Sequence, residues 1–425
     1  MKNSNRRGLE SYAIFRIRDF RFYILSRLPF VLSIQMQAVI VGWQIYDITK
    51  DPLALGLIGL AEAIPSIMVA LYAGHLADRF ERKRIAVYSN FVLILCSFLL
   101  FLFTLDGQKF LATYGAGPIY YVIILSGIAR GFIGPSIFAF MTQIVPKDLY
   151  PESAAWSGTS FQIGSVLGPA LGGLVYGFYG VTVAYFVDFV FVSISFLFLM
   201  QIPSRSLPEI PSKESLYASL SAGIRFVLKN EYVLGAMSLD MFAVLFGGAV
   251  ALLPIFAAEI LHVGSEGLGF LRAAPSVGAV IVAVYLAHRP PLFHSGKILL
   301  GCVAGFGLSM LLFAISRNFY LSLFALFLSG SFDSVSVIIR STIMQIMTPD
   351  SMRGRVSAVN KMFIGSSNEI GAFESGITAK FMGTVPSVLF GGTMTLAIVA
   401  LSTRVFPKLI DLELKDFLDK TSTEN

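Results

Sequence analysis

The chain has 425 residues, of which 55% are hydrophobic and only 14% are charged, and this apolar content exceeds what the surface of a soluble globular protein allows. Its formal net charge of +6 would suit a nucleic-acid-binding protein, but the charges fall between apolar runs of about 20 residues, the length of helix that crosses a bilayer. These runs are continuously apolar rather than alternating, which excludes a transmembrane β-barrel. The composition therefore predicts an all-α membrane protein and excludes a nucleic-acid partner.

Apolar runs bounded by charged residues, proline or glycine predict twelve membrane-spanning helices. They lie near residues 22–46, 53–74, 85–105, 118–144, 156–178, 182–202, 232–258, 267–288, 297–315, 319–346, 354–382 and 385–405. Residues 1–21 are polar and basic and lack the apolar core of a cleavable signal peptide, so we expect the first span to stay in the membrane.

The twelve spans divide into two sets of six, separated by a proline-containing stretch of mixed charge that indicates a linker with a surface helix. We expect an N-terminal six-helix bundle at 1–202, a cytoplasmic linker at 203–231, a C-terminal bundle at 232–405 and a cytoplasmic tail at 406–425. Lys and Arg in the connections number 23 on the side that holds both termini and four on the other side. Because cytoplasmic loops carry the excess of positive residues, we expect both termini in the cytoplasm and the protein in the inner (cell) membrane.

A weak internal repeat supports the division into halves. A shift of 202 residues aligns Gln143 with Gln345, Ile144 with Ile346 and Asp148 with Asp350. Two halves repeated in the same orientation predict two pseudo-symmetric bundles, with a substrate site between them near the middle of the membrane.

The connection after the second span reads Gly74-His75-Leu76-Ala77-Asp78-Arg79-Phe80-Glu81-Arg82-Lys83-Arg84. It resembles the signature loop of the major facilitator superfamily, with Glu81 where that pattern usually has glycine, and we expect this difference to change the turn. A basic cytoplasmic loop is the simpler explanation of the four cations, but it does not explain Gly-x-Leu-Ala-Asp-Arg at this place. The resemblance implies a cytoplasmic lock in which Asp78 lies near the N-terminus of the eleventh span. Its residues would be Gly74, Asp78, Arg79, Arg82, Asp148 and Arg353.

The fifth span contains Gly164-x-x-x-Gly168-Pro169-x-x-Gly172-Gly173, in which four-residue spacing places three glycines on one face. Small residues let membrane helices pack closely, and packing alone would explain them. The complete string also resembles the antiporter motif of exporters in this superfamily, which favours export over uptake. With the segments at 15–21 and 353–356, it resembles the enterobactin-exporter and macrolide-efflux branch, the third drug:proton antiporter family.

Ionisable side chains at the centre of a membrane helix cost at least about 2.5–3.5 kcal/mol each, so we expect them to face water or a partner. Glu62 lies near the middle of the second span with no cation three or four residues away on its own helix. Burial disfavours the charged form of such a carboxyl, so Glu62 is the predicted proton carrier, and a structural carboxylate bonded to a neighbouring helix is the alternative. An arginine placed like Arg130 in superfamily exporters implies that Arg130 modulates this protonation.

In the second half, Asp333 lies one residue beyond the position that the repeat aligns with Arg130, so an Arg130–Asp333 pair between the halves is a hypothesis. Glu369 in the eleventh span is a further proton-coupling candidate, and neutralisation by Lys361 is its simpler explanation. Asp188 and Asp240 are weaker candidates.

A subset of apolar side chains is expected to line a substrate cavity, although most Phe and Met residues pack or face lipid. These are Met36, Phe138, Met241 and Phe332.

The sequence contains no P-loop, dinucleotide-binding glycine pattern, nucleophile elbow or metal-ligand cluster, so we expect no enzyme activity, cofactor or metal. We predict a monomeric secondary transporter that exports an amphiphilic organic compound, such as a siderophore or a macrolide, in exchange for protons by alternating access. An uptake symporter and a transport-inactive sensor on the same fold are the alternatives.

Overall fold

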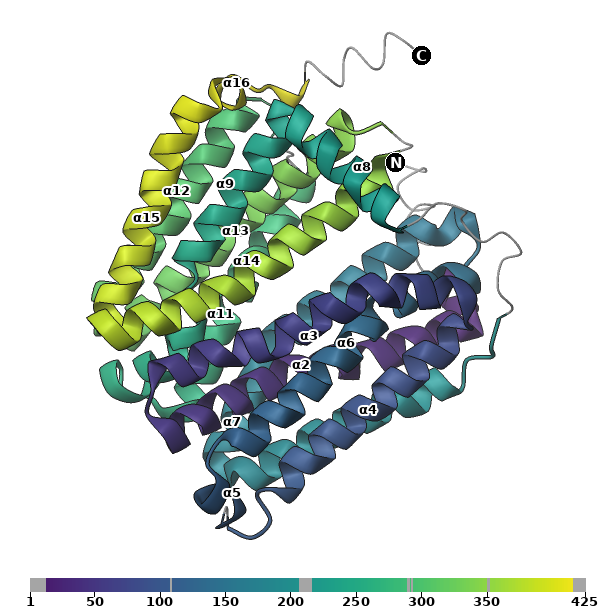
Figure 1. The fold of residues 1–425 in the computed structure, drawn as a ribbon, viewed down its shortest axis with the longest axis vertical. Helices are drawn as coiled ribbons and strands as arrows, with labels where there is room; N and C mark the ends of the chain where they lie inside the picture. Colours follow the sequence, from purple (N-terminus) through teal and green to yellow (C-terminus); the bar gives the residue numbers. More distant parts are fainter. Residues whose placement is uncertain are drawn as a thin grey trace, which may run out of the picture. The chain divides into compact units, whose positions relative to one another are not determined.

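The computed structural model describes residues 13–107, 109–205, 216–288, 291, 293–349 and 352–415. Within these residues all regular structure is helical, and long helices run alongside one another (Figure 1). This confirms the predicted all-α membrane fold.

The first half of the chain forms long helices joined by short connections. They are α2 (Arg18–Thr49), α3 (Pro52–Arg79), α4 (Arg82–Leu102), α5 (Lys109–Tyr114), α6 (Gly117–Ile144) and α7 (Tyr150–Met200), with short 3-10 helices at Ala13–Arg16 (η1) and Lys147–Leu149 (η2). The helix α7 is interrupted at Gly180, where φ is 82° and ψ is 171°. Only glycine takes such angles without strain, so the predicted fifth and sixth spans meet at this residue.

The second half begins with the surface helix that the sequence predicts in the linker, α8 (Leu216–Lys229), which packs on α9 and α14. The helices that follow are α9 (Glu231–Gly247), α10 (Leu253–Ile255), α11 (Gly264–His288), α12 (Ser295–Ile315), α13 (Phe319–Met347), α14 (Arg353–Met382), α15 (Thr384–Val405) and α16 (Pro407–Ile410).

The seventh span predicted at 232–258 corresponds to one helical segment, Glu231–Ile260, but it is not a single α-helix. Helix α9 ends at Gly247, and a 3-10 helix (η3, Ala249–Leu252), the three-residue α10 and a π-helix (η4, Phe256–Ile260) follow it. The break falls where the sequence has Gly247 and Gly248, which are poor helix formers, and Pro254, which lacks a backbone N–H.

Ten helical segments in the described part of the chain are long and apolar enough to cross a membrane. One of them, Lys147–Met200, holds two predicted spans, which meet at the kink at Gly180. Helix α14 is not among the ten, since Lys361, Glu369 and Glu374 make it polar, but its 30 residues are enough to span a bilayer and it packs beside α9 and α15. Each of the twelve predicted spans therefore corresponds to a helical segment.

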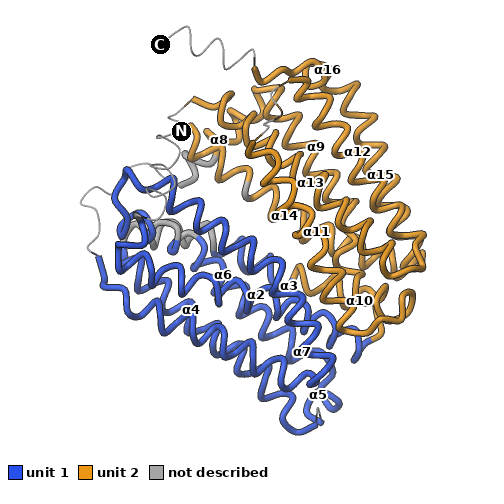
Figure 2. The backbone as a smooth tube through the Cα atoms, turned by 180° about the vertical axis from the view of Figure 1, so that it is seen from behind, with its two compact units in different colours: residues 1–49, 61–213 blue, residues 50–60, 214–425 orange. Residues whose placement is uncertain are grey.

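Contacts between Cα atoms divide the chain into two compact units (Figure 2). Unit 1 comprises residues 1–49 and 61–213, and unit 2 comprises residues 50–60 and 214–425. Helix α3 is shared between them, because its first turns pack in unit 2 and the rest packs in unit 1.

Each unit has its own buried apolar cluster. In unit 1, α2 packs along α7, and α4 packs on α6 and α7, with a cluster that includes Phe20, Tyr23 and Phe140. In unit 2, a cluster that includes Val233, Leu299 and Ile339 joins α9, α12 and α13. Most of the charged residues described next lie on these same helices, and Glu62 lies on α3 and Glu369 on α14.

Candidate functional site

Two glycines of α6 let this helix approach α3 closely within unit 1. A Cβ atom at Gly131 would lie 2.7 Å from the carbonyl oxygen of Ser66, and a Cβ atom at Gly127 would contact the carbonyl oxygen of Glu62. Only glycine leaves room for this approach. It brings Arg130 of α6 beside Glu62 of α3.

Arg130 and Glu62 form an ion pair through Nη1 and Oε1. The Arg130 side chain is 17% exposed and the Glu62 side chain is 31% exposed, so the pair is partly accessible. The expectation that burial without a charge partner governs Glu62 is wrong for this structure, because its cation comes from another helix. The close partner does match the expectation that Arg130 lies near the acid whose protonation it would influence.

A hydrogen-bonded chain continues from Arg130 into the interior of unit 1. Arg130 Nη2 donates to Gln37 Oε1 at 3.2 Å, and Gln37 Nε2 donates to Asp188 Oδ2 at 3.2 Å. Asp188 is fully buried, and its Oδ1 accepts a hydrogen bond from Ser33 Oγ at 2.5 Å. The Gln37 amide therefore connects the Glu62–Arg130 pair to a second carboxyl group.

Unit 2 contains a comparable cluster. Arg340 of α13 pairs with Asp240 of α9 through Nη1 and Oδ2, and Asp333 Oδ1 lies 3.9 Å from Arg340 Nη2. The Arg340 and Asp240 side chains are 6% and 8% exposed, whereas the Asp333 side chain is 48% exposed. Asp240, Phe332 and Asp333 line a small pocket that also includes Cys302 and Phe306. Asp333 is thus the accessible carboxyl of this cluster.

Arg130 and Asp333 each have an ion-pair partner within their own unit, and the hypothesis of a pair between them stays a prediction. The ion-pair partner of Arg130 is Glu62 of unit 1, and that of Asp333 is Arg340 of unit 2. Each unit neutralises an arginine with a carboxylate of its own.

The glycines of the fifth-span motif lie against the backbone of α2. A Cβ atom at Gly168 would lie 2.6 Å from Gln35 Cβ and 3.0 Å from the carbonyl oxygen of Leu32, and one at Gly172 would lie 2.9 Å from the carbonyl oxygen of Met36. A Cβ atom at Gly164 would contact the side chain of Val31. Pro169 and Gly173 of the same motif are also buried on α7. The motif therefore forms the contact surface between α7 and α2.

This packing predicts a selective effect of side-chain volume on α7. Replacing Gly168 with valine inserts atoms where no space exists, so we expect a loss of about 1–3 kcal/mol of stability and a larger loss of export than of substrate binding. Gly158→Val is the matched control, because a Cβ atom at Gly158 meets nothing within 4 Å. Thermal unfolding and transport assays of the two variants measure the difference. Equal effects of both substitutions, or equal loss of binding and export, would contradict this prediction.

Most residues of the predicted lock lie in helices. Helix α3 continues to Arg79, so Gly74, Asp78 and Arg79 belong to its last turns rather than to a loop, and their side chains lie outside the described residues. Arg82 begins α4, and Asp148 lies in η2. Arg353 begins α14 and donates from Nη2 to the carbonyl oxygen of Gln345 at 3.3 Å.

Glu81 takes ordinary backbone angles, and the expectation that it changes the turn relative to the family pattern stays a prediction. Glu81 has φ of −56° and ψ of 116°, angles that any residue adopts, so this connection does not need glycine. Its Oε2 atom pairs with Arg84 Nε at 2.8 Å.

The predicted cavity residues differ in their surroundings. Met36 is fully buried and packs against Gly172, and its place in a substrate cavity stays a prediction. Phe332 lines the pocket of unit 2, and Met241 is partly buried on α9. The side chain of Phe138 lies outside the described residues.

Glu369 of α14 points toward the first turns of α3. A Cβ atom at Gly59 would lie 2.5 Å from Glu369 Oε2, so this carboxyl occupies the space beside that glycine. The side chain of Lys361, its proposed neutralising partner, lies outside the described residues.

One ion pair of unit 2 lies at the connection between α2 and α3, outside the membrane-spanning helices. Asp51 Oδ2 accepts a hydrogen bond from Lys380 Nζ at 2.9 Å, and Asp51 Oδ1 accepts one from Leu53 N at 3.0 Å. The hydrogen bond from Lys380 is the main reason why the pKa of Asp51 lies below its ordinary value. A lowered carboxyl pKa adds stability above the unfolded-state pKa and loses it as the pH falls through the folded-state pKa.

We therefore expect Asp51→Asn to leave the pH dependence of transport unchanged between about pH 5.5 and about pH 8, where Asp51 stays ionised. The pair is solvent-exposed, so the substitution should cost only about 0.2–1 kcal/mol of stability. Transport rates and unfolding midpoints across this pH range provide the measurement. A shifted pH profile in the variant would instead make Asp51 part of the proton-coupling machinery.

Comparison with protein families decides the class of the chain. The family model described as transmembrane secretion effector matches residues 9–422. The chain belongs to this family of the major facilitator superfamily.

Curated relatives of this secretion effector match it over nearly their whole length. The enterobactin exporter EntS of Escherichia coli O1:K1 is 26% identical over 394 residues, which cover 92% of each chain. The enterobactin exporter EntS of Shigella boydii serotype 18 shows the same identity and coverage.

Solved structures show the same fold as this secretion effector. A bacterial homologue of the iron transporter ferroportin, in an inward-facing state, has a TM-score of 0.70 at 18% identity, covering 93% of this chain and 99% of that chain. The nucleoside transporter NupG has a TM-score of 0.67 at 14% identity, covering 91% of this chain and 99% of that chain. These likenesses establish the transporter fold of the chain.

The sequence does not predict one member of the hydrogen-bonded series from Glu62 to Asp188, and it understates the importance of Asp188 and Asp240. Gln37 is absent from the candidates above, although an amide in the apolar first span is a signal for a buried hydrogen-bonding role. Asp188 and Asp240 are weaker candidates than Glu62 by sequence, but each forms a buried contact with another helix.

Proposed function

We propose that this secretion effector exports an amphiphilic organic compound in exchange for protons. The observation that carries the proposal is the partly accessible Glu62–Arg130 pair, connected through Gln37 to the buried Asp188. The family description and the enterobactin exporters of similar length support export as the direction.

The charges of unit 1 explain how a proton would act. With Glu62 and Asp188 both ionised, the cluster holds two carboxylates and one guanidinium, and therefore one net negative charge. Protonation of Glu62 removes that charge and breaks its pair with Arg130, which then has Asp188 as its remaining acidic neighbour through Gln37. Release of the proton restores the original pair, so the two states differ in the position of a positive charge at membrane depth.

The cluster of unit 2 has the same charge composition. Arg340 is held by the buried Asp240, and Asp333 faces the pocket with nearly half of its side chain exposed. We propose Asp333 as the second proton-coupling carboxyl and Glu369 as a further one on α14. Asp240 keeps Arg340 in place.

The substrate would be a siderophore or a macrolide. The enterobactin exporters among the relatives support the siderophore, and apolar side chains such as Phe332 of the unit 2 pocket and Met241 of α9 would contact the rings of the substrate. In this proposal both termini lie in the cytoplasm, the protein acts as a monomer, and the lock formed by Gly74, Asp78, Arg79, Arg82, Asp148 and Arg353 closes the cytoplasmic side.

Transport by everted membrane vesicles tests the direction. Enterobactin and erythromycin are supplied outside vesicles whose interior is made acidic, and the proposal predicts accumulation that collapses when the gradient is dissipated. Accumulation only in right-side-out vesicles with an acidic exterior would identify an uptake symporter instead. Binding of either compound without flux in both preparations would identify a transport-inactive sensor.

A further inference from the structure

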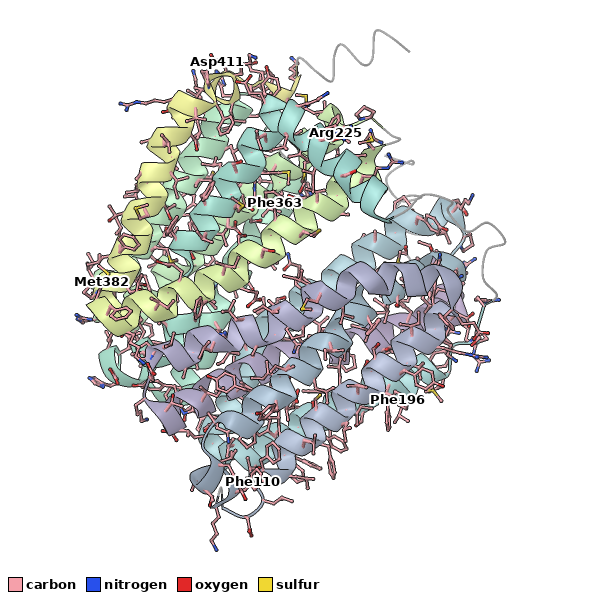
Figure 3. All side chains as sticks on the ribbon, in the orientation of Figure 1. Phe110, Phe196, Arg225, Phe363, Met382 and Asp411 are labelled. Atoms are coloured by element: carbon pink, nitrogen blue, oxygen red, sulfur yellow. The ribbon has the colours of Figure 1, made fainter. Side chains whose placement is uncertain are left out.

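A surface groove of unit 1 lies between the first turns of α4 and the last turns of α7. It is lined by Lys83, Arg84, Val87, Tyr88, Phe91, Phe196, Met200 and Ser204. The rings of Phe91 and Phe196 lie 6.1 Å apart, which closes the groove on its apolar side. Phe196 lies on the outer side of unit 1 beside α4 (Figure 3).

The groove has an apolar end and a basic end. Helix α4 begins at Arg82 and α7 ends at Met200, so the basic end lies where two spanning helices reach the membrane surface. Tyr88 and Phe91 are 69% and 55% exposed, and they continue the groove toward the apolar interior of the membrane. An occupant of this groove must therefore have a polar end at the membrane surface and a hydrocarbon end below it.

The basic end retains unused hydrogen-bond donors. Lys83 Nζ donates to the carbonyl oxygen of Met200 at 3.1 Å, which leaves two of its three donors. The Arg84 side chain is 68% exposed and pairs with Glu81 through Nε at 2.8 Å, which leaves the donors of both terminal nitrogens. These two cations can hold a phosphate group at the membrane surface.

We propose that this groove binds an anionic phospholipid. Its phosphodiester contacts Lys83 and Arg84, and one acyl chain lies along Tyr88, Phe91 and Phe196. An anionic headgroup is favoured over a zwitterionic one because the headgroup of phosphatidylcholine carries its own cation, which opposes the two cations of the groove.

Unit 2 offers an internal comparison. A second groove at helix ends is lined by Phe226, Lys229, Asn230, Glu231, Tyr232 and Lys408. Lys408 Nζ is bound by Glu231 Oε2 at 2.6 Å, so a carboxylate already occupies the place of an anionic headgroup. Glu231 lines the groove of unit 2, whereas Glu81, which pairs with Arg84 through Nε at 2.8 Å, is not among the residues that line the groove of unit 1.

Fluorescence quenching by brominated lipids gives a readout local to the groove. The full-length protein carries Trp43→Phe and Trp156→Phe, which remove both native tryptophans, and Phe91→Trp, which places one in the groove. It is reconstituted in bilayers that contain brominated phosphatidylglycerol or brominated phosphatidylcholine with identical acyl chains. We expect stronger quenching by phosphatidylglycerol, and a preference that weakens as the salt concentration rises.

Two charge variants decide the assignment. Arg84→Gln is expected to reduce the preference for phosphatidylglycerol about 5-fold, and Lys83→Gln/Arg84→Gln about 30-fold. Arg84→Gln retains the hydrogen bond from Lys83 to Met200. It therefore tests the lipid preference even if the double variant loosens the end of α7. Arg225→Gln/Lys229→Gln removes the same charge from α8 and should leave the preference unchanged. Equal quenching by both lipids, or a preference that survives the loss of Lys83 and Arg84, would overturn the proposal.

Discussion

Replacing Glu62 with glutamine is expected to abolish proton-driven export while substrate binding is retained. Glutamine keeps the volume of the protonated carboxyl but cannot release a proton, so Arg130 loses the partner whose charge changes in the cycle. The stability loss should stay below the about 3–5 kcal/mol measured when a fully buried pair is broken, because this pair is partly accessible. Concentrative transport should fall to background, and downhill exchange of labelled for unlabelled substrate should continue.

The matched control for this experiment is Glu231→Gln. Glu231 is also ion-paired, with Lys408 at 2.6 Å, but at the exposed start of α9. The Glu231→Gln variant should transport substrate at the wild-type rate. If Glu62→Gln concentrates substrate with normal pH dependence, the coupling acid lies elsewhere, and Asp333 or Glu369 takes its place in the proposal.

Replacing Asp240 with asparagine is expected to destabilise the protein by about 3–5 kcal/mol, because it leaves the guanidinium of Arg340 buried without its closest carboxylate. Asp333→Asn should cost less than about 1 kcal/mol, since its carboxyl is half exposed and 3.9 Å from the same arginine. Thermal unfolding of the two variants in one detergent measures the difference.

Transport assays separate the two aspartates further. Asp333→Asn should fold normally and lose proton coupling, whereas Asp240→Asn should lose folded protein. Equal unfolding midpoints for these variants would contradict the division of roles between a fixed and an accessible carboxyl.

The sequence predicts the number and order of the spans well because each apolar run is a local signal. The sequence is a poor guide to where an α-helix ends when only one or two residues decide whether the helix continues. The α-helix of the seventh span ends at Gly247 although its apolar run continues to 258, and α3 continues to Arg79 although its charged end is typical of a loop.

Pairing of charged residues is harder to predict than their presence. Glu62 and Arg130 stand out because charges are rare in apolar runs, but their pairing depends on which helices approach closely. Gly127 and Gly131 determine that approach, and nothing in one sequence shows which helix lies against them. Met36 illustrates the same limit, because a uniformly apolar helix does not indicate which side faces a cavity.

Proton release on substrate binding tests the central claim most directly. Enterobactin and erythromycin are added to the purified protein in a weakly buffered solution with a pH indicator, and binding is followed by the fluorescence of Trp43 and Trp156. The account predicts that the wild type releases protons as it binds one of these compounds, and that Glu62→Gln binds it with a smaller release. Binding by the wild type without proton release, or release of the same size from Glu62→Gln, would contradict it.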